Sequence, residues 1–342
     1  MKWLIKKTFF RLSRFVNKNE RVVNAAVKPA ATPRRPLAYE AMIENSQTAK
    51  PRFLVLSGCQ SKMIAGFCEV LTLGQSSYHF LSIKKVEGFA KGGWKSYQED
   101  LDNADFIYTQ KRQVADFLLS HNNYKDKVYY FPVINCACFH PDIAYMQHDG
   151  ERLVGPMGDY HSLLITAAYF AGFTQRQTLG LFNPDVYSAL KFDVKKERER
   201  AGFIAKFKKE GIDLTAAITR WDSEGQWMRT VNHPIRNVIF EIVLKVLQRD
   251  GVEVVNHSPS VVDWIEDDLA RSAEWPLYPL DGDTSLLIFK SPYSGSGNGI
   301  YFNLEKFIEY SFASLLMVDK EKLNVNGRNL DEMIKVLEDM KE

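Results

Sequence analysis

A short apolar run that changes abruptly to helical spacing constrains this chain more than any other feature. Residues 53–56 are apolar throughout, as in a strand buried on both faces, and Ser57-Gly58 interrupts the run. From Lys62 onward the apolar residues recur at the spacing of a helix, at Met63, Ile64, Phe67, Val70 and Leu71. The stretch therefore predicts a strand, a tight turn and a helix, with Cys59 in the turn.

The position of Cys59 favours a nucleophile. A thiol beside the N-terminus of a helix meets unpaired N–H groups and the positive end of the helix dipole, and both favour the thiolate. The arrangement has the logic of the strand-to-helix turn that presents a serine in hydrolases. Structural burial is the alternative for Cys59, and it is the role we expect for Cys68, which lies among the apolar positions of the same helix.

Length and composition indicate a large globular core. The chain has 342 residues, of which 45% are hydrophobic and 13% aromatic. Its four cysteines have no regular spacing, which argues against a disulfide scaffold and fits a reducing compartment, so we expect a cytoplasmic protein. We expect a basic N-terminal arm and linker over residues 1–50 and an α/β domain with C-terminal helices over 51–342.

The net charge of +2 conceals an asymmetry. Residues 1–36 carry ten Lys and Arg against the single acid Glu20, which leaves the remainder net negative by seven. Residues 1–16 interleave aromatic side chains with cations and predict an amphipathic helix on an anionic membrane surface, here the inner face of the cell membrane. An arm packed on its own domain or on a partner is the alternative. Nucleic acid is not expected as a partner, because the acidic body would repel phosphates.

The order of the remaining segments predicts the fold class. Further strands are expected at 78–83, 104–110 and 128–131, with a helix at 113–119 after the second of these. Strands that alternate with helices at this spacing predict an α/β fold with a parallel sheet flanked by helices. Ligands of such sheets bind at the carboxyl ends of the strands, where Cys59 and Gln110 fall.

The second half of the chain is expected to be mostly helical. A loop is predicted at 221–234, a strand at 252–255, and further loops at 88–94 and 291–299. The glycines of 291–299 lack the strand-to-helix context and the lysine of a phosphate-binding loop. Helices are predicted at 161–171, 193–210, 237–249, 304–317 and 330–340.

A thiolate nucleophile needs a base, and three histidines have distinctive settings. They are His140 before Pro141, His161 after Tyr160, and His233 before Pro234. His233 precedes a long amphipathic helix, and its predicted place in a loop at the start of that helix favours it as the base. Two cysteines close to His140, at positions 136 and 138, suggest zinc, but their spacing matches none of the usual zinc patterns, so no metal is expected.

Several short motifs, taken in order, resemble the WcbI-type family of polysaccharide-biosynthesis acetyltransferases over roughly residues 52–280. The motifs are Gly58-Cys59-Gln60 after the first strand, 104–110, Phe131-Pro132 followed by His140-Pro141-Asp142, and Asn232-His233-Pro234 before a helix. The family pattern has Asn between Gly and Cys, whereas Gly58 directly precedes Cys59 here.

The resemblance implies a fold related to the SGNH and GDSL esterases, with a cysteine in place of the serine. It also implies binding of coenzyme A and transfer of acetyl from acetyl-coenzyme A to a sugar hydroxyl of a capsular or other surface polysaccharide. Carried over, Cys59 is the nucleophile and His233 the base. In the esterases an Asp three positions before the histidine orients it, but Thr230 stands there, so the third member stays open between none, Asp222 and Asp142.

The remaining site residues are assigned within this scheme. The backbone N–H of Cys59 and the amide of Gln60 or Gln110 would bind the oxyanion. The acceptor sugar would meet His140, Asp142 and Asn232. The residues expected near coenzyme A are Gly58, Lys62, Lys111, Arg112 and His161.

Two other functions remain open at this stage. A cysteine esterase that removes acyl groups from glycans would use the same residues, and a non-catalytic binding protein held at the membrane by the basic arm would need none of them. Direct acetyl transfer without a covalent intermediate is an alternative to an acetyl-enzyme.

Overall fold

The computed structural model describes residues 50–279, 282–293, 300–326 and 329–341. The predicted basic arm and proline-rich linker lie outside these residues, as do positions 294–299 of the predicted loop 291–299. The chain divides into two units, Met1–Pro33 and Arg34–Glu342, and every element below belongs to the second.

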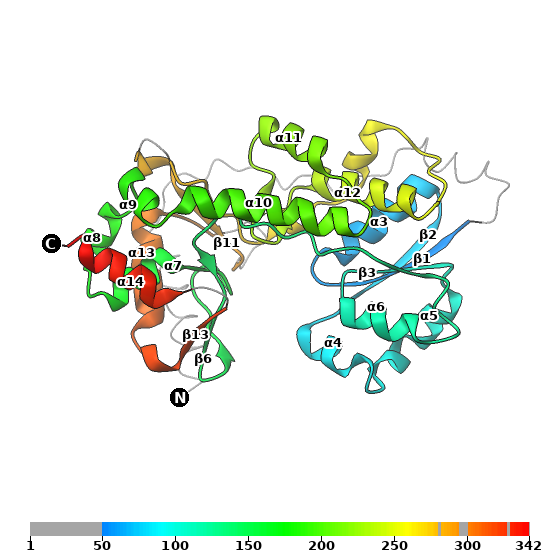
Figure 1. The fold of residues 1–342 in the computed structure, drawn as a ribbon, viewed down its shortest axis with the longest axis horizontal. Helices are drawn as coiled ribbons and strands as arrows, with labels where there is room; N and C mark the ends of the chain where they lie inside the picture. The colour runs from blue at the N-terminus through cyan, green and yellow to red at the C-terminus, as the bar shows by residue number, and fades with distance from the viewer. Residues whose placement is uncertain (1–49, 280–281, 294–299, 327–328, 342) are drawn as a thin grey trace. The chain divides into compact units, whose positions relative to one another are not determined.

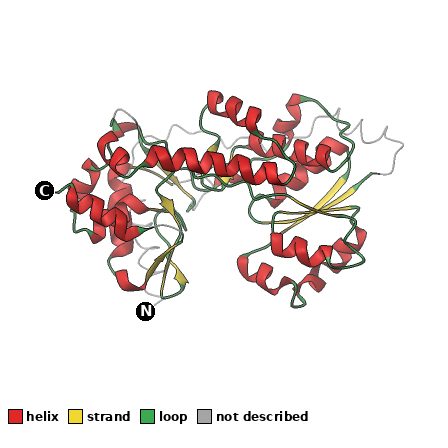
Figure 2. Cartoon of the chain, in the orientation of Figure 1, coloured by secondary structure: helices red, strands yellow, loops and turns green. Residues whose placement is uncertain are grey.

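A parallel sheet forms the first part of the described chain. Its strands are β1 (Arg52–Ser57), β2 (Gln75–Phe80), β3 (Phe106–Thr109) and β4 (Val128–Tyr130). They are hydrogen-bonded in the order β2-β1-β3-β4, and every pair is parallel. Figure 2 shows these strands in yellow between helices. The predicted α/β class with a parallel sheet is therefore confirmed.

Helices cover both faces of this sheet, which explains why β1 is apolar throughout. Phe53 and Val55 pack into one core with α3 and α12, whereas Leu54 and Leu56 pack into another with α4, α5 and α6 (Figure 1). The bounds of these helices are α3 (Ser61–Thr72), α4 (Ile83–Phe89), α5 (Gln98–Asn103), α6 (Arg112–Leu119) and α12 (Arg236–Arg249).

The strand order reverses between β1 and β3. From β1 the chain passes through α3 on one face to β2, and it returns to β3 through α4 and α5 on the other face. The connection after β1 enters α3 on one face, whereas the connection after β3 enters α6 on the other face. Proteins of the α/β class bind ligands at such a reversal of strand order. The turn that holds Cys59 follows β1, and Gln110 follows β3.

A second core lies in the C-terminal half. Its centre includes Trp275, Phe289 and Phe307, all fully buried. As predicted, C-terminal helices pack here, with α13 (Leu304–Leu315) and α14 (Leu330–Asp339) against α7 (Leu163–Phe170). The long helix α10 (Phe192–Lys209) joins the two parts, since Phe192 belongs to this core and Phe203 and Phe207 to the first (Figure 1).

Shorter elements complete the described chain. Its other helices are α8 (Gln175–Gly180), α9 (Pro184–Ala189) and α11 (Thr215–Glu224). The remaining strands are β5 (Ile143–Ala144), β6 (Met146–His148), β7 (Glu151–Arg152), β8 (His161–Ser162), β9 (Met228–Thr230), β10 (His233–Pro234), β11 (Ile288–Ser291), β12 (Ile300–Asn303) and β13 (Leu323–Val325).

Three local predictions were wrong. The predicted loop 221–234 contains the end of α11 and the two strands β9 and β10, which pair with each other. The predicted strand 252–255 joins no sheet, because the backbone N–H groups of Val255 and Asn256 both bind the Leu71 carbonyl at the end of α3. The predicted loop 88–94 contains the end of α4 and the start of a 3₁₀ helix at Gly93–Tyr97.

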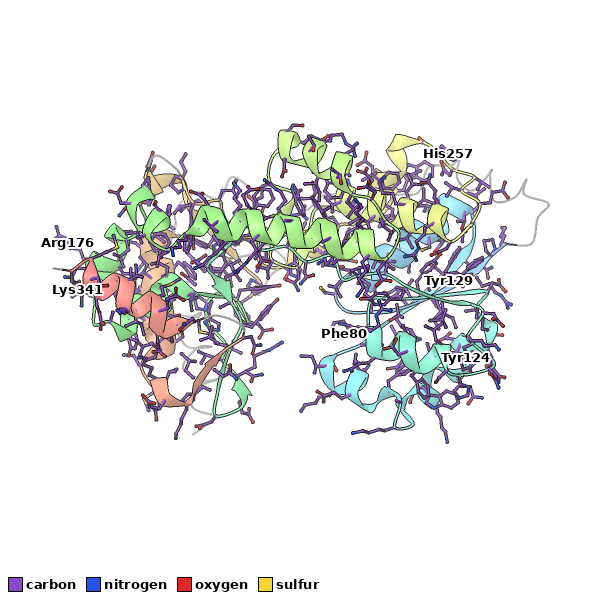
Figure 3. All side chains as sticks on the ribbon, viewed as in Figure 1. Phe80, Tyr124, Tyr129, Arg176, His257 and Lys341 are labelled. Carbon is purple, nitrogen blue, oxygen red and sulfur yellow. The ribbon has the colours of Figure 1, made fainter. Side chains whose placement is uncertain are left out.

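Strand β2 lies at the edge of the sheet and is only partly covered. Phe80, labelled in Figure 3, is 54% exposed at its carboxyl end. No helix within the described ranges is both long and apolar enough to span a membrane.

Candidate active site

Cys59 occupies the predicted turn, between the last residue of β1 and the first residue of α3. Its side chain is exposed, whereas Cys68, Cys136 and Cys138 are buried. Gly58 accepts a hydrogen bond from the backbone N–H of Ser61 at 3.1 Å, which closes the turn before the helix. Cys59 is therefore the cysteine that a substrate can reach.

The electrostatic surroundings of Cys59 act in opposite directions. Desolvation by neighbouring protein atoms raises the pKa of the Cys59 thiol, whereas its own backbone N–H and the charge of Lys111 lower that pKa. The net pKa is raised, so the turn alone does not produce the thiolate that we expected. Lys111 Nζ lies 3.6 Å from the point that a Cβ on Gly58 would occupy.

Asn232 brings a side-chain amide to the sulfur. Its Nδ2 lies 3.9 Å from Cys59 Sγ. Its Oδ1 accepts hydrogen bonds from the Tyr160 hydroxyl at 2.6 Å and from the Thr230 hydroxyl at 3.3 Å. The asparagine that we assigned to the acceptor sugar thus contacts the candidate nucleophile itself.

His233 lies in β10 rather than in a loop, and it is 5% exposed. Its Nε2 is 3.2 Å from the Tyr160 hydroxyl. No hydrogen bond joins His233 and Cys59 directly, and Tyr160 and Asn232 connect the two. Desolvation lowers the pKa of His233 to about 4, against the opposing effect of the Ala273 carbonyl. The imidazole is therefore neutral at pH 7.

The carboxylate that acts on His233 is neither of the two that the sequence suggested. Asp267 raises the pKa of His233, but Arg229, which pairs with Asp267 at 2.9 Å, lowers that pKa by more. Asp222 instead accepts hydrogen bonds from Trp227 and Arg200.

Gln60 and Gln110 form a buried network beneath the turn. The Nε2 of Gln60 donates to the carbonyls of Ile134 and Asn232, at 2.7 and 3.0 Å. The Nε2 of Gln110 donates to Gln60 Oε1 at 3.1 Å and to the Pro132 carbonyl at 3.3 Å. The amide hydrogens of both side chains are thus already bound to protein oxygens. The predicted donation from Gln60 or Gln110 to an oxyanion would require one of these hydrogen bonds to break.

The three cations expected near coenzyme A, Lys62, Lys111 and Arg112, have different surroundings. Lys62 pairs with Asp268 at 2.7 Å and with Glu266 at 3.4 Å. Arg112 pairs with Glu210 and stacks 3.7 Å over the Tyr130 ring. Carboxylates compensate both charges, whereas Lys111 lies beside the turn and acts on Cys59.

Two other predicted site residues, His140 and Asp142, are enclosed in the protein. His140 is 1% exposed, with Nε2 3.1 Å from the Met228 carbonyl. Asp142 accepts hydrogen bonds from Ser162 at 2.7 Å and Tyr278 at 2.8 Å. Binding of the acceptor sugar by His140 and Asp142 would require these side chains to leave buried protein partners, and it stays a prediction.

His161, assigned to coenzyme A, is also a structural residue. Its Nε2 lies 3.1 Å from the Leu153 carbonyl, and burial lowers the pKa of its imidazole. A Cβ on Gly155 would stand only 2.9 Å from His161 Cε1, so the glycine allows the ring to pack there.

Sequence reasoning missed the tyrosines of the site. Tyr160 connects Asn232 and His233, and burial raises the pKa of its hydroxyl to about 12, so it stays protonated at pH 7. The Tyr145 ring lies 5.4 Å from the Tyr160 ring, and burial raises the pKa of the Tyr145 hydroxyl as well. The signal was adjacent to a predicted residue, since Tyr160 directly precedes His161.

No group of three or more His, Cys, Asp or Glu within the described part of the chain is arranged to hold a metal ion. A surface cavity of about 430 Å³ lies elsewhere, between α8 and α13. It is lined by Arg176, labelled in Figure 3, together with Glu305 and Lys306, and it contains none of the predicted site residues.

The family model of the polysaccharide biosynthesis enzyme WcbI matches residues 52–254. The chain belongs to the WcbI family. The matched range covers the four-stranded sheet and Cys59, Tyr160, Asn232 and His233, and it ends 26 residues before the end of the predicted range 52–280. Comparison with curated proteins found no match, and neither did comparison with solved structures. Membership of the WcbI family makes this chain a polysaccharide biosynthesis enzyme.

Proposed function

We propose that the protein transfers acetyl from acetyl-coenzyme A to a sugar hydroxyl of a capsular or other surface polysaccharide, with Cys59 as nucleophile. The observation that carries this proposal is the exposed Cys59 thiol at the strand-order reversal, with the Asn232 amide 3.9 Å from its sulfur. Membership of the WcbI family supports a substrate that belongs to polysaccharide synthesis. We also propose that the fold is related to that of the SGNH esterases.

The chemistry requires a proton acceptor for the thiol, and we assign this role to His233 acting through Tyr160. The Tyr160 hydroxyl lies within hydrogen-bonding distance of both Asn232 Oδ1 and His233 Nε2. Rotation about its C–O bond directs the hydroxyl hydrogen to either partner, so the hydroxyl can accept a proton on the substrate side while it passes its own to Nε2. His233 is neutral at pH 7 and is thus able to accept it.

The two half-reactions then balance. The Cys59 thiol gives its proton to His233, its sulfur bonds to the acetyl carbon, and the carbon–sulfur bond of the donor breaks; coenzyme A leaves as its thiol after taking that proton from His233. In the second half, the sugar oxygen bonds to the same carbon, its proton passes to His233, and the Cys59 thiolate leaves. We assign the oxyanion of both steps to the backbone N–H of Cys59.

Of the three cations expected near coenzyme A, Lys111 is the best suited to bind it. Lys111 lies at the carboxyl end of β3, beside the turn, and its ammonium group suits a phosphate or the thiolate. Lys62 and Arg112 would first have to leave their carboxylate partners.

Replacement of the nucleophile tests the function. Purified wild-type protein is incubated with acetyl-coenzyme A and a surface glycan, and both the acetylated glycan and the peptide that contains Cys59 are measured by mass spectrometry. We expect wild-type protein to acetylate the glycan and Cys59→Ala to lose at least about 100-fold in rate, because a covalent nucleophile is removed. Cys68→Ala, which removes a buried thiol from α3, the helix that follows Cys59, should keep the activity.

The alternatives give other results in the same assay. Acetyl groups lost from an acetylated glycan without added acetyl-coenzyme A would indicate an esterase. An equal absence of transfer in wild type and Cys59→Ala, with glycan binding intact in both, would indicate a binding protein. Membrane association through residues 1–16 remains a prediction, because these residues lie outside the described part of the chain.

A further inference from the structure

Asn232 contacts the sulfur of Cys59, and two hydroxyl groups hold its side chain. Its Nδ2 lies 3.9 Å from Sγ, while its Oδ1 accepts from Tyr160 and from Thr230. We propose that Asn232 is a catalytic residue whose amide N–H donates a hydrogen bond to the sulfur of Cys59, with Tyr160 and Thr230 as the residues that position it. This inference rests on the proposed role of Cys59 as nucleophile.

The two hydroxyls determine which end of the amide faces the sulfur. A side-chain amide has one acceptor oxygen and one donor nitrogen, and both hydroxyl groups donate to the oxygen. An amide rotated by 180° would direct an oxygen lone pair at the sulfur, and both hydroxyl groups would have to accept from its nitrogen instead of donating to its oxygen. In the structure the nitrogen faces Cys59.

The backbone keeps the two residues at this separation. The Asn232 carbonyl accepts a hydrogen bond from Gln60, the residue directly after Cys59, at 3.0 Å. The neighbouring Val231 carbonyl accepts from the backbone N–H of Cys136 at 2.8 Å. The Asn232 side chain takes no part in either bond, so a substitution there leaves these contacts in place.

The donor stabilises the charge that the sulfur carries during the reaction. A hydrogen bond to an ionised group is roughly twice as strong as one between neutral groups, so it favours the thiolate over the thiol. Desolvation opposes this charge at Cys59. The amide is also uncharged at every working pH, so its donation does not depend on its own protonation.

Other groups act on the same sulfur and must be separated from Asn232. Lys111, in the connection between β3 and α6, favours the thiolate. A charge on Cys59 in turn raises the pKa of the Tyr145 and Tyr160 hydroxyl groups. His233 lies behind Tyr160. Asn232→Ala leaves these side chains in place but removes the acceptor of the Tyr160 hydroxyl, and Asn232→Asp adds a charge beside them.

The test is the pH dependence of Cys59 alkylation by iodoacetamide, measured on the peptide that contains Cys59 in the full-length protein without substrate. The three other cysteines are at most 2% exposed and react slowly. We expect Asn232→Ala to raise the apparent pKa of Cys59 by about one unit, since a hydrogen bond to a charged group is lost. Asn232→Asp should raise it further because a carboxylate replaces the donor.

Matched variants separate donation from a structural effect. Tyr160→Phe and Thr230→Val keep Asn232 but remove one hydroxyl each, and each should raise the thiol pKa by less than Asn232→Ala does. Asn183→Asp adds the same charge at the N-cap of α9, where Asp caps equally well, and should leave the thiol pKa unchanged. Circular dichroism and melting temperature check that each variant is folded.

An unchanged thiol pKa in folded Asn232→Ala and Asn232→Asp would overturn the proposal. Because the titration contains no acetyl-coenzyme A, its result is independent of the acetyl-transfer assay. Absence of transfer in wild type would overturn the proposed function, whereas an unshifted titration would overturn only the donor role of Asn232.

Discussion

At the scale of single residues, what an amide or a cation can do depends on the partners it already has. Gln60, Gln110 and Asn232 all lie near the carboxyl ends of the strands. The two glutamines use their N–H groups to join backbone carbonyls, whereas the Asn232 amide nitrogen faces the sulfur. Lys62 and Lys111 differ in the same way, because Lys62 alone is held by two carboxylates. Residue type predicted the chemistry, and the contacts decide which residue performs it.

Lys111 is expected to be the cation that affects Cys59. Lys111→Gln removes a positive charge beside the turn and should raise the pKa of Cys59 by up to about one unit, as an opposite charge at this range lowers a thiol pKa. The pH dependence of iodoacetamide alkylation measures the change. Calorimetry with coenzyme A should show weaker binding in the same variant.

Lys62→Gln is the matched control for this prediction. It removes the same charge from the helix that follows the turn, but from an ion pair with Asp268. Alkylation of Cys59 should stay close to wild type. If Lys62→Gln shifted the thiol pKa as much as Lys111→Gln, the thiol pKa would depend on the total positive charge near the turn and not on Lys111 in particular.

At the scale of elements, α3 connects the nucleophile turn to the edge strand, and its end is tightly built. Leu73 adopts a left-handed backbone with φ of 54°, and Gly74 follows it. A Cβ on Gly74 would stand 2.4 Å from the Pro51 carbonyl oxygen, which accepts the backbone N–H of Gln75 at the start of the β1–β2 ladder. That oxygen cannot move without breaking the ladder.

Gly74→Ala should therefore destabilise the fold by about 1–3 kcal/mol, the usual cost of inserting a methyl group into a packed site. Urea unfolding followed by circular dichroism measures the loss. Gly202→Ala serves as the control, because Gly202 lies in α10 and a Cβ there meets no atom within 4 Å. Its helix should gain about 0.5–1 kcal/mol. Equal effects of both substitutions would argue against the close contact.

At the scale of the whole molecule, residues beyond the family match contribute to the site. The match ends at residue 254, yet Asp267 and Ala273 influence His233. The last part of the chain thus acts on the candidate base, although none of its residues was predicted to act there.

Buried histidines should make the whole molecule sensitive to acid. Desolvation lowers the pKa of His140 and of His233 from 6.5 to about 4. The unfolded chain therefore binds more protons than the folded chain between these values, so stability is present above pH 6.5 and is lost as pH falls toward 4. Each residue accounts for up to about 3 kcal/mol over this window.

Urea unfolding at intervals between pH 7.5 and pH 4.5 tests this dependence. His140→Gln should flatten the slope of unfolding free energy against pH, whatever its effect on stability at pH 7.5. An unchanged slope in that variant would show that His140 titrates in the folded protein as it does in the unfolded chain.

The sequence by itself determined the strand, turn and helix around Cys59, the parallel sheet with helices on both faces, and the family. These follow from local apolar spacing and from short motifs whose order is preserved along the chain. Only the tertiary structure decided which polar groups meet. His140, Asp142 and His161 are enclosed by segments far away in the sequence. Tyr160 meets His233 directly across 73 positions, and Asn232 connects Tyr160 to Cys59. Hydrogen bonds and burial depend on such distant partners, and no local pattern records them.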